Sequence, residues 1–133
     1  MTTVIRRSGT LSVSRVQERR HTLSWQVTGG VWSPPTDVFE TESDYVVAVE
    51  VAGMRESEFD VMYDNGTLLI SGKRPDATER RAYYQMEIHF GQFSTAAALP
   101  GPVDLDRAAA EYKDGFLVVK LPKLKSSNVK IEA

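Results

Sequence analysis

The feature that most constrains the fold is a β-hairpin pattern in the last quarter of the chain. Asp114-Gly115 is a dipeptide that readily adopts the positive φ angles of a two-residue turn. The segment 116–121 that follows is rich in β-branched and aromatic side chains, as in a largely buried strand, and 107–113 supplies the partner strand. Pro122 has no amide hydrogen and is expected to end the second strand.

Short strands separated by glycine turns recur upstream. Apolar residues alternate with others over 45–51, which indicates a half-buried strand. Residues 59–63 alternate in the same way, and Asn65-Gly66 joins them to a partner strand at 67–70. Residues 93–99 form a plausible strand of small side chains. Strands at this spacing predict an all-β fold, an antiparallel β-sandwich.

One internal segment does not fit a compact sandwich. About twenty residues between Gly72 and Phe93 have no clear core pattern, and 73–81 is strongly charged. A structureless loop of this length is uncommon inside a small domain and is usually functional or disordered. Residues 83–86 could form a short strand within it. The alternative interpretation is a mobile surface loop.

The two ends of the chain differ from the domain. The polar tether 123–128 leads to Val129 and Ile131, whose side chains point to the same side of an extended segment. Such a tail can add itself as a strand to another sheet, the alternative being a frayed terminus. Residues 1–31 hold five arginines and one acid, a balance of +4, against −6 for the remainder. Gly29-Gly30 makes this a flexible arm, in which Ser14 could cap a short helix.

The residue types give little support to catalysis. The chain has no cysteine, and its two histidines, His21 and His89, are far apart in sequence. No serine lies in a nucleophile-elbow context, and no glycine pattern matches a phosphate-binding loop. We therefore expect no enzyme activity, no cofactor and no metal, and a packed or interfacial role for His89. No apolar run is long enough to span a bilayer, and no secretory signal is evident, so we expect a cytoplasmic protein.

Several motifs together resemble the small heat shock proteins of the α-crystallin family. Ala110-x-x-x-Asp114-Gly115-Phe116-Leu117 is similar to the family signature Ala-x-x-x-Asn-Gly-Val-Leu, and Val129-x-Ile131 is similar to its C-terminal Ile-x-Ile. Residues 32–42 resemble the entry into the α-crystallin domain, and 87–93 followed by Leu99-Pro100 resembles its middle. At 51–53 the chain has Val-Ala-Gly where the family has Leu-Pro-Gly.

The resemblance to the bacterial and plant members implies an immunoglobulin-like β-sandwich and a division of the chain into three parts. These are a flexible N-terminal arm at 1–31, the α-crystallin domain at 32–122 and a C-terminal extension at 123–133. It implies an ATP-independent holdase that binds partly unfolded client proteins and prevents their aggregation under stress. It also implies a homodimer that assembles into larger homo-oligomers.

The residues expected to carry these roles fall into three sets. By resemblance, the internal loop crosses to the partner subunit, through Arg80, Arg81, Tyr83, Tyr84 and Met86. The tail residues Val129 and Ile131 would lie in a groove formed by the strands near 59–63 and 107–113 of a neighbouring sandwich. The arm is too polar to build a core but holds enough apolar side chains to contact clients, namely Val4, Ile5, Leu11, Leu23, Trp25 and Val27.

Two other functions remain open from the sequence. A co-chaperone of the CS-domain type would bind one folded partner and would be monomeric. A basic arm could instead touch nucleic acid or a membrane surface. The domain behind the arm is acidic, so we expect no specific nucleic-acid partner.

Overall fold

A computed structural model describes residues 2–7, 10–16 and 31–124. These residues form an all-β fold, as predicted, with two short 3₁₀ turns. The strands are β1 Thr2–Arg7, β2 Thr10–Val16, β3 Thr36–Glu40, β4 Asp44–Glu50, β5 Phe59–Asp64, β6 Thr67–Arg74, β7 Gly91–Ala98, β8 Ala109–Lys113 and β9 Phe116–Pro122, and the turns are η2 Glu56–Glu58 and η3 Leu105–Arg107.

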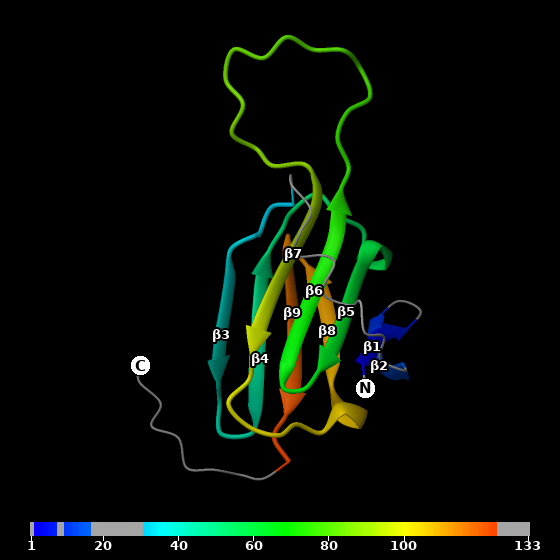
Figure 1. The fold of residues 1–133 in the computed structure, drawn as a ribbon, viewed down its shortest axis with the longest axis vertical. Coiled ribbons are helices and arrows are strands. Elements are labelled where there is room, and N and C mark those ends of the chain that lie inside the picture. Colours follow the sequence, from blue (N-terminus) through cyan, green and yellow to red (C-terminus); the bar gives the residue numbers. More distant parts are fainter. Residues whose placement is uncertain (1, 8–9, 17–30, 125–133) are drawn as a thin grey trace.

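The strands form two antiparallel sheets that pack face to face as a β-sandwich (Figure 1). One sheet has the order β3-β4-β9-β8, and the other has the order β5-β6-β7. β1 and β2 form a hairpin that pairs with β5 through β1 and with β8 through β2. The two sheets are therefore joined by hydrogen bonds into one continuous strand order, β3-β4-β9-β8-β2-β1-β5-β6-β7.

The Asn-Gly and Asp-Gly dipeptides singled out in the sequence both form the predicted turns. Asn65 and Gly66 have φ angles of 49° and 81° between β5 and β6, and Asp114 and Gly115 have φ angles of 54° and 82° between β8 and β9. Positive φ at both central residues is the geometry of a type I′ turn, whose twist matches that of the flanking strands. These turns fix the register of the two hairpins that carry most of the sandwich.

The core lies between the two sheets and is built by alternation along the strands. The largest side chains with almost no exposed surface are Phe59, Phe93, Leu68, Ile70, Leu117, Leu121, Val47, Val49, Val51, Val61 and Val119. Burying each such side chain contributes about 1.5–3 kcal/mol to folding. Between the sheets, the hydroxyls of Thr36 and Thr95 lie 2.9 Å apart in a hydrogen bond, so the buried Thr95 is satisfied.

The observed strands differ from the predicted ones in several places. β3 carries two exposed apolar side chains and was not predicted as a strand. β6 continues to Arg74 rather than ending at residue 70, because its outer half pairs with β7. Pro122 is the last residue of β9 rather than the first beyond it. The helix proposed to start at Ser14 is wrong, since Ser14 lies within β2 and pairs with Val4.

Candidate functional site

Strands β5 and β8 cover most of the segments 59–63 and 107–113, and they are end strands of the two sheets. The groove expected between them stays a prediction. Phe59 is fully buried, and its ring centroid lies 5.0 Å from that of Tyr112, so an aromatic pair joins the two sheets at β5 and β8. Burial raises the pKa of the Tyr63 phenol, and a backbone hydrogen bond with Gly66 partly offsets this.

The edges of β5 and β8 are paired with the arm. Thr3 and Val4 of β1 pair with Tyr63 and Met62 of β5. On the other side, Leu11 and Ser12 of β2 pair with Ala110 and Ala109 of β8. In Figure 1 the β1–β2 hairpin, drawn in blue, lies beside β5. The sequence predicted an arm that swings free of the sandwich, and the structure shows instead that part of it forms two strands of the sheet.

The predicted arm residues divide into two groups. Val4 and Ile5 lie on β1 and Leu11 lies on β2. Leu23, Trp25 and Val27 lie outside the described residues, as do the Gly29-Gly30 joint and His21. The hairpin could have been predicted from residues 10–16, where the apolar Leu11 and Val13 alternate with polar residues as in a strand.

The Tyr112 hydroxyl fixes the turn that follows β4. It donates to the Val51 carbonyl oxygen at 2.8 Å and accepts from the Met54 amide at 3.3 Å. Gly53 between them has a φ of 83°, a conformation that favours glycine. The Tyr112 hydroxyl therefore binds both ends of residues 51–54, the turn in which this chain has Ala52 where the family has proline.

The root of the C-terminal extension is anchored before the tail begins. The amide of Lys123 donates to the Ser43 carbonyl at 2.8 Å, and that of Leu124 donates to the Pro102 carbonyl at 3.2 Å. The Lys123 ammonium is buried and lies 2.8 Å from Glu40 Oε2, a close charge contact without good hydrogen-bond angles. Sequence reasoning placed Lys123 in a polar tether and missed this pair. Val129 and Ile131 lie outside the described residues.

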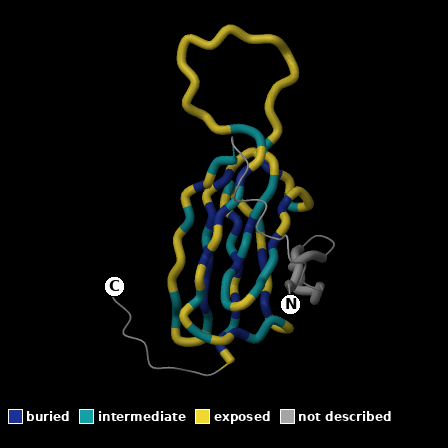
Figure 2. The backbone as a smooth tube through the Cα atoms, viewed as in Figure 1, coloured by how far each residue is buried: buried dark blue, intermediate teal, exposed yellow. Residues whose placement is uncertain are grey.

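Residues 75–90 form a long loop that extends away from the sandwich (Figures 1 and 2). All five predicted dimerisation residues lie on it: Arg80, Arg81, Tyr83, Tyr84 and Met86. Tyr84 is fully exposed at 105%, and Met86 and Ile88 are 64% and 65% exposed. In this single chain the segment makes no strand. Ile88 was not among the predicted residues, although it continues the two-residue spacing of Tyr84 and Met86.

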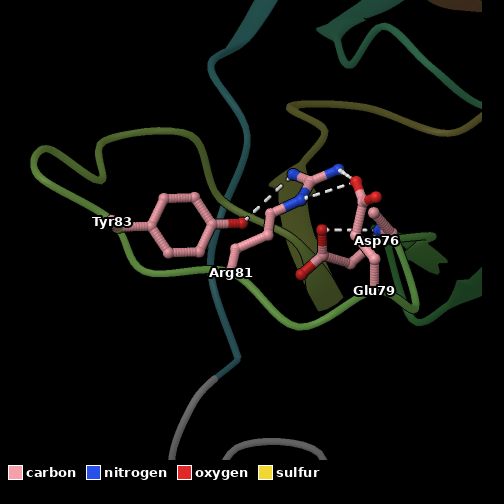
Figure 3. A network of polar contacts seen from close by, with 5 residues as sticks. Asp76, Glu79, Arg81 and Tyr83 are labelled. Atoms are coloured by element: carbon pink, nitrogen blue, oxygen red, sulfur yellow. Dashed lines mark hydrogen bonds and ion pairs between the residues drawn. The ribbon is translucent and has the colours of Figure 1, made fainter.

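Polar contacts within the loop are local (Figure 3). Arg81 forms an ion pair with Glu79 at 2.6 Å and donates to the Tyr83 hydroxyl at 3.3 Å. The Glu79 carboxylate, and to a smaller extent the Tyr83 hydroxyl, raise the pKa of the Arg81 guanidinium. These partners are only two residues away, so they shape the loop without attaching it to the sandwich.

The loop is attached to the sandwich at its root. Arg74 Nε donates to the His89 carbonyl at 2.8 Å, and Nη1 donates to the Ala52 carbonyl at 3.3 Å. The Arg74 guanidinium carbon lies 4.4 Å from the centroid of the Trp32 ring, on which His89 also stacks at 5.3 Å. His89 is exposed in this chain apart from its stack on Trp32, so a packed or interfacial role for it stays a prediction. The cluster joins the two ends of the loop to the start of the domain.

At the far side of the sandwich, β3 presents a second strand edge. Among the described residues β3 is the last strand of its order and pairs only with β4. Val38 and Phe39 are 45% and 50% exposed on it. An edge strand with large exposed apolar side chains is a surface to which another strand can add.

Residues 2–7, 10–16 and 31–124 contain no group of three or more histidines, cysteines or acids positioned to hold a metal ion. Within the same part of the chain, no helix has the length and hydropathy to cross a membrane.

Comparison with known proteins agrees with this geometry. The Hsp20/alpha crystallin family model matches residues 37–132. Small heat shock protein C4 of Rickettsia felis is 37% identical over 102 residues, which is 75% of this chain and 63% of that protein. This chain therefore spans less than two thirds of that relative.

Two solved structures show the same sandwich. Heat shock protein 16.0 from Schizosaccharomyces pombe has a TM-score of 0.67 and 33% identity, with 76% of this chain and 96% of that chain covered. A small heat-shock protein from Xylella fastidiosa, described as having a distinct high order structure, has a TM-score of 0.63 and 26% identity, with 77% and 96% covered. By its strands, its turns and these matches, the chain belongs to the Hsp20/alpha crystallin family.

Proposed function

We propose that this protein is an ATP-independent holdase, which binds partly unfolded proteins and keeps them from aggregating under stress. The observation that carries the proposal is a family sandwich whose loop and edge strand leave large apolar side chains in solvent. Tyr84, Met86 and Ile88 on the loop and Phe39 on β3 are each at least half exposed. Exposed apolar surface of this kind marks sites of association with other chains.

The building block is proposed to be a homodimer formed by exchange of the 75–90 loops. Tyr84, Met86 and Ile88 are spaced by two, so an extended backbone would present them on one face. The backbone of residues 75–90 forms no β-ladder within its own chain. The outer edge of β3 has no strand paired to it among the described residues and can accept one. Addition of this segment to β3 of the partner would satisfy both backbones and cover Val38 and Phe39.

Larger homo-oligomers are proposed to form through the tail. Val129 and Ile131 would lie against the groove between β5 and β8 of a neighbouring dimer. Burying these two side chains contributes about 1.5–3 kcal/mol each, and ordering the tether costs about 1–2 kcal/mol per residue fixed. The balance for one tail is small, so such contacts open readily and hold an assembly only in number. The Xylella fastidiosa relative is described as having a high order structure.

Clients are proposed to bind mainly through the arm, with its apolar residues at 4, 5, 11, 23, 25 and 27. We assign the protein to the cytoplasm and give it no catalytic role. The −6 balance of residues 32–133 opposes binding to nucleic acid or to an anionic membrane surface.

The test is suppression of heat-induced aggregation of a model client. We expect protection at near-stoichiometric ratios and no effect of ATP. Strict dependence on ATP, or no protection at large excess, would rule out the holdase. A strictly monomeric mass in solution together with absent protection would favour a co-chaperone of the CS-domain type.

The tail is tested separately by changing Val129 and Ile131 to alanine. Because the tail lies beyond the core strands, we expect the sandwich to remain folded by circular dichroism. Species above the dimer should shrink in multi-angle light scattering. An unchanged mass distribution would leave the tail without a role in assembly.

A further inference from the structure

We infer that Arg74, the last residue of β6, sets the direction in which the 75–90 loop leaves the sandwich, and that the strength of the dimer depends on this side chain. The inference rests on the proposed function in one respect, that the loops exchange between two copies. Arg74 is not among the residues expected to reach the partner. Its role is that of a positioning residue, which acts on the partner only through the loop.

The loop has no attachment to the sandwich between its two ends. Among the described residues, the hydrogen bonds of 75–88 all join residues of the loop to one another. Every residue of 75–89 is exposed. A segment with neither buried side chains nor long-range hydrogen bonds cannot fix its own direction. The direction of the loop is therefore set where the loop joins β6 and β7.

The Arg74 guanidinium connects several parts of the chain at that place. Nε and Nη2 both donate to the His89 carbonyl at the end of the loop, and Nη1 donates to the Ala52 carbonyl in the turn after β4. The guanidinium carbon lies 4.4 Å from the centroid of the Trp32 ring and 5.5 Å from that of the Phe90 ring. A planar guanidinium with its donors in a fixed fork can make these contacts together, whereas a lysine ammonium cannot.

The base to which Arg74 ties the loop is itself fixed. Arg74 pairs with Gly91 at the end of the β6–β7 ladder, and Gly91 has a φ of 88°, a conformation that favours glycine. The Trp32 indole N–H donates to the Gly91 carbonyl at 3.3 Å, and the Trp32 amide donates to the Gln92 carbonyl at 3.1 Å. The ring that the guanidinium contacts is thus attached to β7. Arg74 joins the exposed loop to this part of the sheet.

The expected effect on the dimer follows from the fraction of time that the loop points correctly. The apparent dissociation constant equals the intrinsic one divided by that fraction. A hydrogen bond from a charged donor changes such a fraction by about tenfold or more. The proposed two-fold dimer exchanges two loops, so loss of Arg74 in both chains should raise its dissociation constant by about a hundredfold.

The first measurement observes the loop in single chains at picomolar concentration, where no partner can hold it. The full chain has no cysteine, so two dyes can be attached through T78C on the loop and A98C at the other end of β7, both at exposed positions. Donor lifetimes in single-molecule energy transfer resolve distances that interchange more slowly than nanoseconds, as loop motions do. We expect one narrow distance distribution in the chain with Arg74 and a broader, shifted one in the R74M and R74K variants.

The second measurement is the dissociation constant of the dimer, obtained by fluorescence-detected sedimentation over a dilution series. R74M should raise it about a hundredfold, and a mixed dimer with one R74M chain should show an increase of about tenfold. R74K keeps the charge but lacks the fork, so it should resemble R74M. The matched control is K73M, which removes an exposed cation from the same strand and should change neither measurement. Urea unfolding followed by circular dichroism verifies that each variant keeps the sandwich.

Two results would overturn the inference. One is the same distance distribution in R74K as in the chain with Arg74, even if the variant is less stable in urea, since Arg74 would then act in folding alone. The other is an unchanged dissociation constant in R74M when replacement of residues 76–84 abolishes the dimer. If that replacement leaves the dimer intact, the proposed exchange of loops is wrong. The energy-transfer result needs no dimer, so it then decides by itself whether Arg74 directs the loop.

Discussion

At the residue scale, the sandwich depends on a few close approaches and buried contacts. Gly72 lies on β6, where its backbone passes the Phe93 ring. A Cβ at this position would lie 2.7 Å from Phe93 Cζ and 3.0 Å from the Glu58 carbonyl oxygen. Phe93 is itself fully buried between the sheets. The Glu58 oxygen belongs to the backbone, so it can give way only if the chain shifts.

We therefore expect Gly72→Ala to destabilise the protein by about 1–3 kcal/mol through overpacking. The matched control is Ser71→Ala on the same strand, which adds no atoms. Urea denaturation followed by tryptophan fluorescence measures both. A Gly72→Ala variant as stable as the control would show that the strand can shift without loss.

The Lys123–Glu40 pair allows a second prediction at this scale. Removing the Glu40 charge leaves the buried Lys123 ammonium uncompensated. Replacing Lys123 by methionine leaves only the Glu40 carboxylate, whose side chain is 30% exposed and can be hydrated. We expect Glu40→Gln to lower the free energy of unfolding by about 1–3 kcal/mol. Lys123→Met should leave it unchanged or raise it. Thermal melts of the two variants decide the order, and the reverse order would contradict this interpretation.

At the element scale, strands determined by local residues could be predicted from the sequence, whereas strands determined by pairing with distant strands were missed. The hairpins at Asn65-Gly66 and Asp114-Gly115 were predicted because turn chemistry and alternation are local signals. β3 was missed, since Val38 and Phe39 face outward and only pairing with β4 makes that segment a strand. The β1–β2 hairpin was missed for a related reason. Its place is set by the edges of β5 and β8, which lie far away in the sequence.

The loop supports a prediction at the same scale. Replacing residues 76–84 by a short Gly/Ser turn removes Tyr84 and most of the segment proposed to reach the partner. Arg74 and its contacts with Trp32 and His89 stay in place, so the sandwich should remain folded. We expect monomers by light scattering at concentrations where the unmodified protein is dimeric. A dimer that survives the replacement unchanged would locate the interface elsewhere.

At the scale of the whole molecule, the arm is part of the sheet and also the proposed contact for clients. It supplies two of the nine strands in the described part of the chain and joins the two sheets. The other seven strands form both sheets and, with Val51 after β4, supply the large buried side chains named above. The domain should therefore fold without it.

We expect a chain that starts at Val31 to form a folded β-domain dimer that protects clients poorly. Trp25→Ala should show a milder form of the same loss, because an aromatic side chain offers the largest single apolar contact in the arm. Aggregation suppression at matched concentration measures the effect, and circular dichroism verifies the fold. Full protection by the shortened chain would assign client binding to the sandwich.

The separation between core and loop has an evolutionary consequence. Within the part of the chain that the structure describes, no side chain of residues 75–90 belongs to the buried core. Substitutions in this segment can thus accumulate with little selection against misfolding. With the loop as the proposed dimer contact, two copies of such a gene in one cell are free to diverge in this segment until each pairs only with its own product, while both keep the same sandwich.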